Sequence, residues 1–281
     1  MGGDKLDLGC GMRSCVVSLV LVLCAGFFFS AGAGCRSAEV FDEAPKPAPD
    51  FARLLESANA GHPDAQFKVG LAYETGTGSA QDYLEAARWY RKAADHGNPG
   101  AQNNLGGLYS RGLGVQQDSA EAMKWYLRAA MDNYPAAQNN VGFLYANGRG
   151  VAQGYEAAVA WYRKAAAREY AAAENNLGFM YQNGWGVAAD VKGAEKWYRK
   201  AAKSGYAPAE FNLGLMILRN ANAHREEAMK WFRLAAEHGL NQARQELSLL
   251  DAPEHPGDDA SRLPTLVISA STQQSTTSGI Q

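Results

Sequence analysis

Tryptophan recurs at a fixed interval along this chain, and this spacing constrains the fold more than any other feature. Trp89, Trp125, Trp161 and Trp197 lie 36 residues apart, and Trp231 follows after 34. Each lies in nearly the same phrase: ARWYRKAADHG, MKWYLRAAMDN, VAWYRKAAARE, EKWYRKAAKSG and MKWFRLAAEHG. A period of this length indicates a repeat architecture, in which each unit stacks on its neighbours.

A second phrase precedes each tryptophan phrase, reading DAQFKVGLAYETGTG, GAQNNLGGLYSRGLG, AAQNNVGFLYANGRG, AAENNLGFMYQNGWG and PAEFNLGLMILRNAN. In its second copy, Leu105, Gly106 and Tyr109 fall on one face of a helix, and the tryptophan phrase has the same helical spacing. We therefore expect two helices in each unit. In the second unit, Gly106 on the first helix should allow the second helix to approach closely. Trp125 and Tyr126 are expected to fill the space between units, because neither helix can bury its apolar face alone.

The two phrases, A-[QE]-x-N-[LV]-G-x-[LM]-Y-x-x-G-x-G-V and A-x-x-W-Y-R-K-A-A, resemble the Sel1-like repeat, a relative of the tetratricopeptide repeat. Five full units span residues 62–239, and half-units extend the predicted solenoid to residues 50–250. The resemblance implies an all-α, right-handed α-solenoid whose first helices line a concave binding face. The fifth unit lacks the glycine pair after Arg219, so its loop is expected to differ while its helices are kept.

The first 35 residues are predicted to be an export signal. An uncharged, mostly apolar run, Cys15–Phe29, follows Arg13 and precedes a stretch of small residues. Met12 offers a second possible start for this signal. The sequence therefore predicts a bacterial protein exported to the periplasm or anchored in the membrane as a lipoprotein.

Three ways of processing this signal remain open. Cleavage after Ala33 would give a soluble periplasmic protein. Gly32 to Cys35 resembles a lipobox, in which Cys35 is lipidated, although Gly32 stands where leucine is usual. An uncleaved anchor is the third route, but the apolar run is short for a bilayer span of about 20 residues.

The segments outside the repeats have their own composition. Residues 36–49 form a Pro-containing spacer, and residues 251–281 are rich in Ser, Thr, Asp and Pro, which predicts a disordered tail. All four cysteines lie within the first 35 residues, so the repeats can hold no disulfide and no thiolate metal site.

The repeats offer no recognisable catalytic chemistry. A net charge of −2 without a basic run argues against nucleic-acid binding. The five histidines form no metal motif, and the sequence has no nucleophile motif. The Gly-x-Gly segments follow helices rather than strands, so we interpret them as turns and not as phosphate loops. We therefore predict no enzyme activity, no metal and no cofactor.

A partner-binding groove is predicted from the first helices. Stacking the units gives two columns of residues outside the packed face, whose middle combines asparagine amides with aromatic rings. The predicted groove residues are Phe67, Asn103, Asn139, Asn175, Phe211, Phe143 and Phe179. Asparagine amides both donate and accept hydrogen bonds, so the column could bind an extended peptide; alternatively, the asparagines could bond neighbouring repeats. Trp185, in the fourth Gly-x-Gly segment, either contacts a partner or folds onto its own repeat.

The function predicted from the family resemblance is a non-catalytic scaffold or adaptor of the cell envelope. It would bind a protein or peptide partner as a monomer, touching the membrane only through its signal or lipid anchor. The first alternative is a cell-wall binding protein that takes a muropeptide or glycan. A second is the β-lactamase-like activity described for cysteine-rich relatives, which the absence of cysteines in these repeats disfavours.

Overall fold

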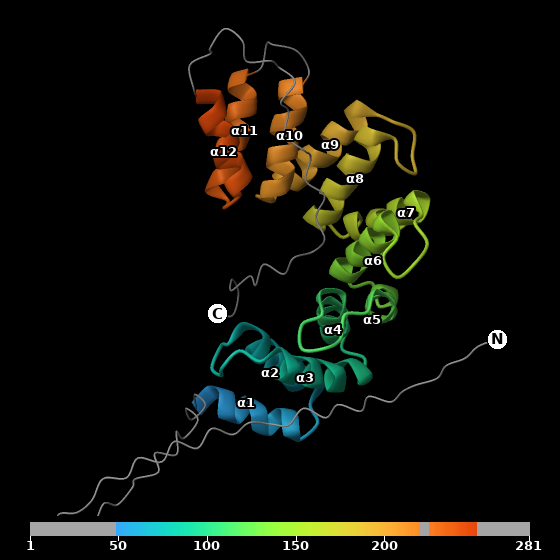
Figure 1. Cartoon of the computed structure of the whole chain (residues 1–281), viewed down its shortest axis with the longest axis vertical. Helices are drawn as coiled ribbons and strands as arrows, with labels where there is room; N and C mark the ends of the chain where they lie inside the picture. Colours follow the sequence, from blue (N-terminus) through green and yellow to red (C-terminus); the bar gives the residue numbers. More distant parts are fainter. Residues whose placement is uncertain (1–48, 220–224, 252–281) are drawn as a thin grey trace, which may run out of the picture. The chain divides into compact units, whose positions relative to one another are not determined.

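The computed structural model describes residues 49–219 and 225–251, which form twelve α-helices and no strand. The helices are α1 (Pro49–Asn59), α2 (Pro63–Thr75), α3 (Tyr83–Asp95), α4 (Pro99–Arg111), α5 (Ser119–Met131), α6 (Pro135–Asn147), α7 (Tyr155–Ala166), α8 (Ala171–Asn183), α9 (Val191–Ala202), α10 (Ala207–Arg219), α11 (Arg225–Glu237) and α12 (Asn241–Asp251). Figure 1 shows these helices following one another in chain order.

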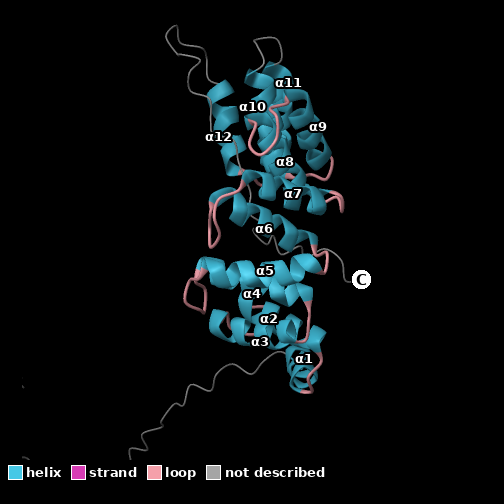
Figure 2. Ribbon diagram, turned by 90° about the vertical axis from the view of Figure 1, so that its right-hand side faces the viewer, coloured by secondary structure: helices cyan, strands magenta, loops and turns pink. Residues whose placement is uncertain are grey.

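Each helix packs mainly against the helices before and after it in the chain. The contacts are most extensive within the pairs α2–α3, α4–α5, α6–α7, α8–α9 and α10–α11, which are the two helices of each unit. Helices and loops alternate without strands throughout the part of the chain drawn in colour in Figure 2. The predicted all-α solenoid is therefore confirmed.

Local sequence signals set the ends of the helices. Asp82 is the N-cap of α3, and its carboxylate accepts hydrogen bonds from the backbone N–H groups of Leu84 and Glu85. Asp118 and Asp190 cap α5 and α9 in the same way. The first helices of four units end at a glycine with positive φ, such as Gly112 at 70°, a conformation that glycine adopts without steric cost.

The two helices of each unit meet where a glycine faces an aromatic ring. A Cβ atom added at Gly106 would lie 2.9 Å from the ring of Tyr126 on α5. Each other unit repeats this contact, at Gly70–Tyr90, Gly142–Tyr162, Gly178–Tyr198 and Gly214–Phe232, with distances of 2.6 to 2.7 Å. A side chain at these positions would push the helices apart, so the close approach predicted from Gly106 is confirmed.

The tryptophans lie between units, as predicted, and in every unit but the second the neighbouring aromatic ring is buried more deeply. Trp125 packs in a cluster with Ala93 of the preceding unit and Leu105 of its own unit. Trp161 is only partly buried, whereas Tyr162 next to it is 0% exposed. Phe232 takes the same deep position in the fifth unit. The ring held against the glycine is thus the centre of each unit, and the tryptophan joins it to the preceding unit.

The Gly-x-Gly loops connect consecutive units at a second place. A Cβ at Gly150 would lie 2.3 Å from the carbonyl oxygen of Ser119, where the preceding unit begins its second helix. Gly114 and Gly186 approach the backbone of Tyr83 and Tyr155 in the same way. These segments join two helices, as their interpretation as turns requires.

The solenoid ends with α12, a helix equivalent to the first helix of a further unit. Ala243 is buried against the fifth unit, but Ser248 stands where the other first helices have their contact glycine. A serine side chain there prevents another second helix from packing as closely as α11 packs on α10. The sequence of α12 therefore suits a terminal half-unit.

Several predicted features lie outside the described residues. These are the export signal with Cys35, nearly all of the spacer, the loop after Arg219 and the tail from residue 252. The fifth unit keeps both its helices, α10 and α11, as predicted. No helix within residues 49–219 and 225–251 is long and apolar enough to cross a membrane.

Two adjacent glycines of α4 test the central contact. Gly106→Ala should lower the free energy of unfolding by about 1–3 kcal/mol, because the added methyl group meets the ring of Tyr126. Gly107→Ala should raise it by about 0.5–1 kcal/mol, because a Cβ there has ordinary contacts and alanine favours the helix. Urea denaturation followed by circular dichroism measures both values. Equal effects of the two substitutions would contradict the proposed role of Gly106.

Candidate partner-binding surface

The asparagines predicted to line a groove instead form hydrogen bonds between units. Asn140 Nδ2 donates to Asn103 Oδ1 at 3.0 Å. The same bond links Asn176 to Asn139 and Asn212 to Asn175, both at 2.9 Å. The first asparagine of one unit thus accepts from the second asparagine of the next, forming an amide ladder along the first helices.

This ladder contradicts the predicted position of the asparagines. Asn103, Asn139 and Asn175 are at most 4% exposed. Phe211 and Phe179 are buried as well, while Phe67 and Phe143 remain partly exposed. The prediction that the asparagine column faces an open groove is wrong, because the next unit covers it. The alternative interpretation, in which asparagines form hydrogen bonds with neighbouring repeats, is the correct one for both asparagines of the Asn-Asn pairs.

A glutamine column forms a second set of bonds between units. Gln102 Nε2 donates to the carbonyl oxygen of Ala94 at the end of the preceding unit, at 3.2 Å. Gln66 and Gln138 make the equivalent bonds to Ala58 and Ala130. These side chains are also buried, so the polar faces of the first helices hold the units together rather than facing a partner.

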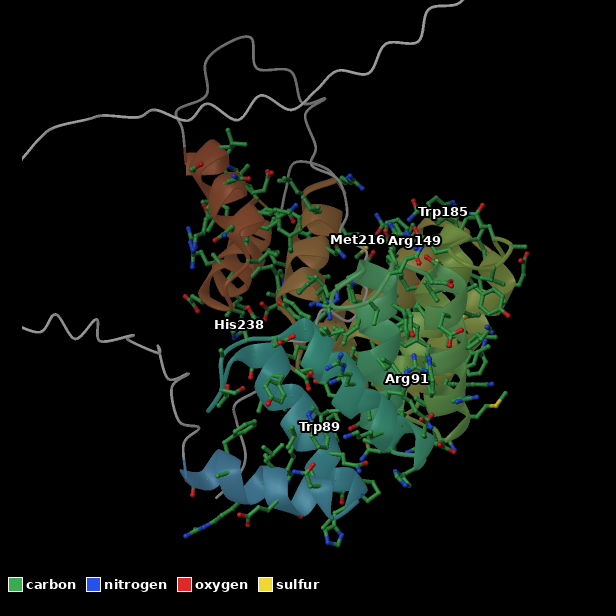
Figure 3. The ribbon with its side chains drawn as sticks, turned by 60° about the horizontal axis from the view of Figure 1, so that its bottom comes forward. Trp89, Arg91, Arg149, Trp185, Met216 and His238 are labelled. Carbon is green, nitrogen blue, oxygen red and sulfur yellow. The ribbon has the colours of Figure 1, made fainter. Side chains whose placement is uncertain are left out.

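The fourth and fifth units replace this glutamine by a buried glutamate. A carboxylate cannot donate a hydrogen bond to a carbonyl group, so each buried glutamate needs a hydrogen-bond donor or a cation beside it. Lys200 Nζ lies 2.8 Å from Glu174 Oε1, and His238 Nδ1 lies 2.8 Å from Glu210 Oε2. His238, labelled in Figure 3, therefore contacts the scaffold.

Aromatic side chains gather instead on the edge where the Gly-x-Gly loops lie. Trp185 stacks on Tyr155 of the preceding unit, with ring centroids 4.9 Å apart and planes at 24°. It also meets Phe179 of its own unit edge to face, with centroids at 5.3 Å. Trp185 thus folds onto both units and still keeps 37% of its surface exposed.

The Gly-x-Gly loop of the third unit has a cationic residue, Arg149, at the position that Trp185 occupies in the fourth unit. Arg149 and Trp185 are the middle residues of consecutive Gly-x-Gly segments, and their backbone N–H groups bond Leu144 and Met180 in the same way. Arg149 is exposed, and Figure 3 shows it near Trp185 in that view. We call the surface formed by Arg149, Tyr155, Trp185 and the exposed Val191 the loop edge.

Comparison with known families decides what these units are. The model of the Sel1 repeat matches residues 63–98, 99–134, 135–170, 171–206 and 207–240, which together are more than half of the chain. The chain belongs to the Sel1 repeat family. The resemblance seen in the sequence is thereby confirmed, and proteins built from Sel1 repeats generally mediate protein–protein interactions.

Solved structures of other Sel1 repeat proteins are similar to this chain. A Sel1 repeat protein from Oxalobacter formigenes is 33% identical, with a TM-score of 0.63, over 72% of this chain and 88% of that one. A protective antigen of uropathogenic Escherichia coli with the same fold is 31% identical, with a TM-score of 0.60, over 71% of this chain. This chain spans only 44% of the length of that antigen. A comparison with curated proteins found no match.

The tyrosine that packs on the contact glycine makes different hydrogen bonds through its hydroxyl group in different repeats of this chain. Tyr90 donates to Glu74 Oε2 at 2.6 Å and accepts from Asn104, and Arg111 pairs with the same glutamate. Burial, and next the negative charge of Glu74, raise the pKa of Tyr90, so its hydroxyl stays a donor. In the fourth unit, Tyr198 donates to Gln182 Oε1 at 3.0 Å.

The third unit lacks this partner. Ala146 stands where the first and fourth units have Glu74 and Gln182, and the buried hydroxyl of Tyr162 has no hydrogen-bond partner. The fifth unit removes both groups, with Phe232 and Leu218 at these positions. The residue differences at these two positions can be read from the sequence. That the two positions contact each other is shown only by the packing of the two helices.

No metal site is evident in the helical units. Residues 49–219 and 225–251 hold no group of three His, Cys, Asp or Glu side chains that could bind a metal ion. The buried carboxylates of Glu74 and Glu174 pair with Arg111 and Lys200, and that of Glu210 contacts the ring of His238. The family is typically non-catalytic, and these side chains act as structural contacts.

Two tyrosine-to-phenylalanine substitutions distinguish these units. Tyr198→Phe should lower the free energy of unfolding by about 0.5–1.5 kcal/mol, because the bond to Gln182 is lost. Tyr162→Phe should be neutral or stabilising, because it removes a buried hydroxyl that has no partner. Thermal denaturation of both variants checks this difference. A loss of stability in Tyr162→Phe equal to that in Tyr198→Phe would refute it.

Proposed function

We propose that this chain is a non-catalytic scaffold of a bacterial cell envelope that binds a protein partner as a monomer. The supporting observation is that the buried polar residues of the first helices and the exposed residues of the loop edge lie in different places. Amides of the first helices are buried in hydrogen bonds between units, and the carboxylates of Glu174 and Glu210 are buried in pairs within their own units. By contrast, Trp185 and Arg149 lie exposed on the loop edge. Protein interfaces are enriched in aromatic residues and arginine.

Crosslinking in the native cell tests the scaffold proposal. A photoreactive amino acid at position 149 should crosslink a defined protein, identified by mass spectrometry, because Arg149 is exposed on the loop edge. The same probe at Arg168, which is exposed at the opposite end of α7, is the control. If neither position captures a discrete protein, the chain is not a protein scaffold.

The envelope location rests on the apolar run and on Cys35. If the lipoprotein route is used, Cys35→Ser should abolish incorporation of labelled fatty acid and release the chain from the membrane fraction. Cleavage after Ala33 would instead give a soluble protein without lipid, both for the unaltered chain and for Cys35→Ser. An uncleaved anchor would leave both of these proteins membrane-bound. Fractionation with intact-mass measurement separates the three routes. Recovery of the uncleaved chain in the cytoplasm would exclude export.

A cell-wall ligand is the second candidate. The exposed ring of Trp185, supported from behind by Tyr155, offers a flat apolar surface on which a sugar ring could lie. Pull-down with purified peptidoglycan separates this candidate from a protein scaffold. A nitrocefin assay on the purified chain tests the β-lactamase alternative, and we expect no hydrolysis.

A further inference from the structure

Four lysines lie along the outer face of α9, the last of them at its C-cap. They are three or four residues apart, so their side chains project from the same side of the helix, and all four are exposed. The opposite side of α9, with Ala194, Tyr198 and Ala201, is buried in the array. We call this set the lysine column, and its members are Lys192, Lys196, Lys200 and Lys203.

The second helices of the other units do not share this column. At the same four positions relative to the tryptophan, α3 and α5 each have two basic residues, and α7 and α11 each have one. An acid occupies at least one of these positions in α3, α7 and α11. The residues are Leu84, Arg88, Lys92 and Asp95 in α3, Ala120, Lys124, Arg128 and Met131 in α5, Glu156, Ala160, Lys164 and Ala167 in α7, and Glu226, Lys230, Leu234 and Glu237 in α11. The repeat scaffold therefore does not require four lysines at these positions.

Helix stability does not explain the first member of the column. Lys192 lies in the first turn of α9, where the helix dipole disfavours a positive charge, and no acid lies in that turn. Glu156 of α7 and Glu226 of α11 stand at the equivalent position, where their negative charge is favourable. A lysine at this place indicates an interaction outside the helix.

The acids that pair with cations of α9 neutralise only one member of the column. Lys200 Nζ lies 2.8 Å from Oε1 of the buried Glu174. Glu195 and Glu227 both contact the guanidinium group of Arg199, at 2.8 and 3.5 Å. Two of these three carboxylates thus neutralise a cation that is not part of the column.

The other three lysines keep their charge. Lys192, Lys196 and Lys203 form no ion pair within residues 49–219 and 225–251. Asp190, at the start of the column, is exposed, and its Oδ1 accepts a hydrogen bond from the backbone N–H of Gly193 at 2.9 Å. Four lysines against the two acids Glu174 and Asp190 leave an excess of two positive charges on this face. The outer faces of α7 and α11, in the units before and after, have no such excess.

The residue types of the column favour a membrane surface over a protein or a nucleic acid. Lysine is depleted from protein interfaces, and arginine is the residue that binds a carboxylate through two parallel hydrogen bonds. The four positions include no aromatic ring on which a nucleic-acid base could stack. The negative surface of an anionic bilayer attracts lysines as point charges and needs neither of these features.

We propose that the lysine column of α9 binds the anionic phospholipid headgroups of a bacterial membrane. This contact adds to the one predicted through the signal or lipid anchor, and it sets which side of the fourth unit is turned toward the bilayer. The inference rests on the proposed envelope location. Attachment at Cys35 through residues 36–49 would hold the solenoid beside the membrane, so that even a weak contact is made at a high effective concentration.

Sedimentation with lipid vesicles tests the proposal on the full chain. Vesicles of phosphatidylglycerol and phosphatidylcholine should bind more of the chain than vesicles of phosphatidylcholine alone. Added salt should reduce this difference, because surface charges are screened. The apolar run Cys15–Phe29 is present in every sample, so its own affinity for lipid adds to the binding of both kinds of vesicle. Equal binding to the two kinds of vesicle at low salt would overturn the proposal.

A triple variant locates the contact on α9. Lys192→Gln, Lys196→Gln and Lys203→Gln together should weaken binding to the anionic vesicles by about tenfold or more, because each lysine near the surface contributes to the attraction. Binding to phosphatidylcholine alone should not change. Circular dichroism confirms that the variant is folded, as expected for three exposed side chains without ion pairs.

A second triple variant is the matched control. Lys92→Gln, Lys124→Gln and Lys230→Gln remove the same charge from exposed positions on α3, α5 and α11, where the lysines are spread over three helices. This variant should keep most of the binding to anionic vesicles. An equal loss in both triple variants would show that net charge alone matters, and the assignment to α9 would then be wrong.

Soluble polyanions distinguish the other possible occupants. If inorganic polyphosphate or an oligonucleotide binds through the three lysines of α9 while anionic vesicles do not, the column is a site for a soluble polyanion and the membrane assignment is wrong. The scaffold function is read separately, by the photoreactive probe at position 149 in the cell. Failure of vesicle binding with continued capture of a discrete protein would refute this inference alone, whereas loss of capture with vesicle binding intact would refute the scaffold function.

Discussion

The two helices of every unit meet at a glycine and an aromatic ring, and the remaining contacts depend on this close approach. The ring packs directly on the glycine position, where a Cβ would be 2.6 to 2.9 Å away. This places the tryptophan next to it in the chain between units, and it brings the first helices close enough for their asparagine and glutamine side chains to bond across units. Because each unit is held largely by its neighbours, the stability of the array depends on every such contact.

The amide ladder and the glutamine column have a functional consequence. Buried amides that lacked partners would each cost about 1–3 kcal/mol, so their mutual bonding is a requirement of the stacked units. Side chains used in this way cannot also bind a peptide. A partner must therefore bind side chains that remain exposed after stacking, such as Arg149 and Trp185 in the Gly-x-Gly loops. The equivalent position is occupied by Leu113, Arg149 and Trp185 in successive units.

Much of the fold could be predicted from the repeat period. The positions of the helices, the contact glycine and the helix caps of Asp82, Asp118 and Asp190 all follow from local spacing and known residue preferences. The candidate site could not be predicted in this way. Asn103 and Asn104 are neighbours on one helix, and whether either meets solvent depends on where the next unit is placed. Helical spacing defines a face, but it does not say which neighbouring element covers that face.

The sequence by itself determined the family, the number of units and the absence of cysteine chemistry from the repeats, because these depend on residue identity and period alone. The tertiary structure decided which polar groups are available. It buried the asparagines predicted to bind a partner, paired Glu174 with Lys200 and Glu210 with His238, and left Trp185 partly exposed in contact with the rings of Tyr155 and Phe179. The physical reason is that the exposure of the asparagines is set by hydrogen bonds between residues 37 positions apart, in consecutive units, which the local pattern of either segment does not contain.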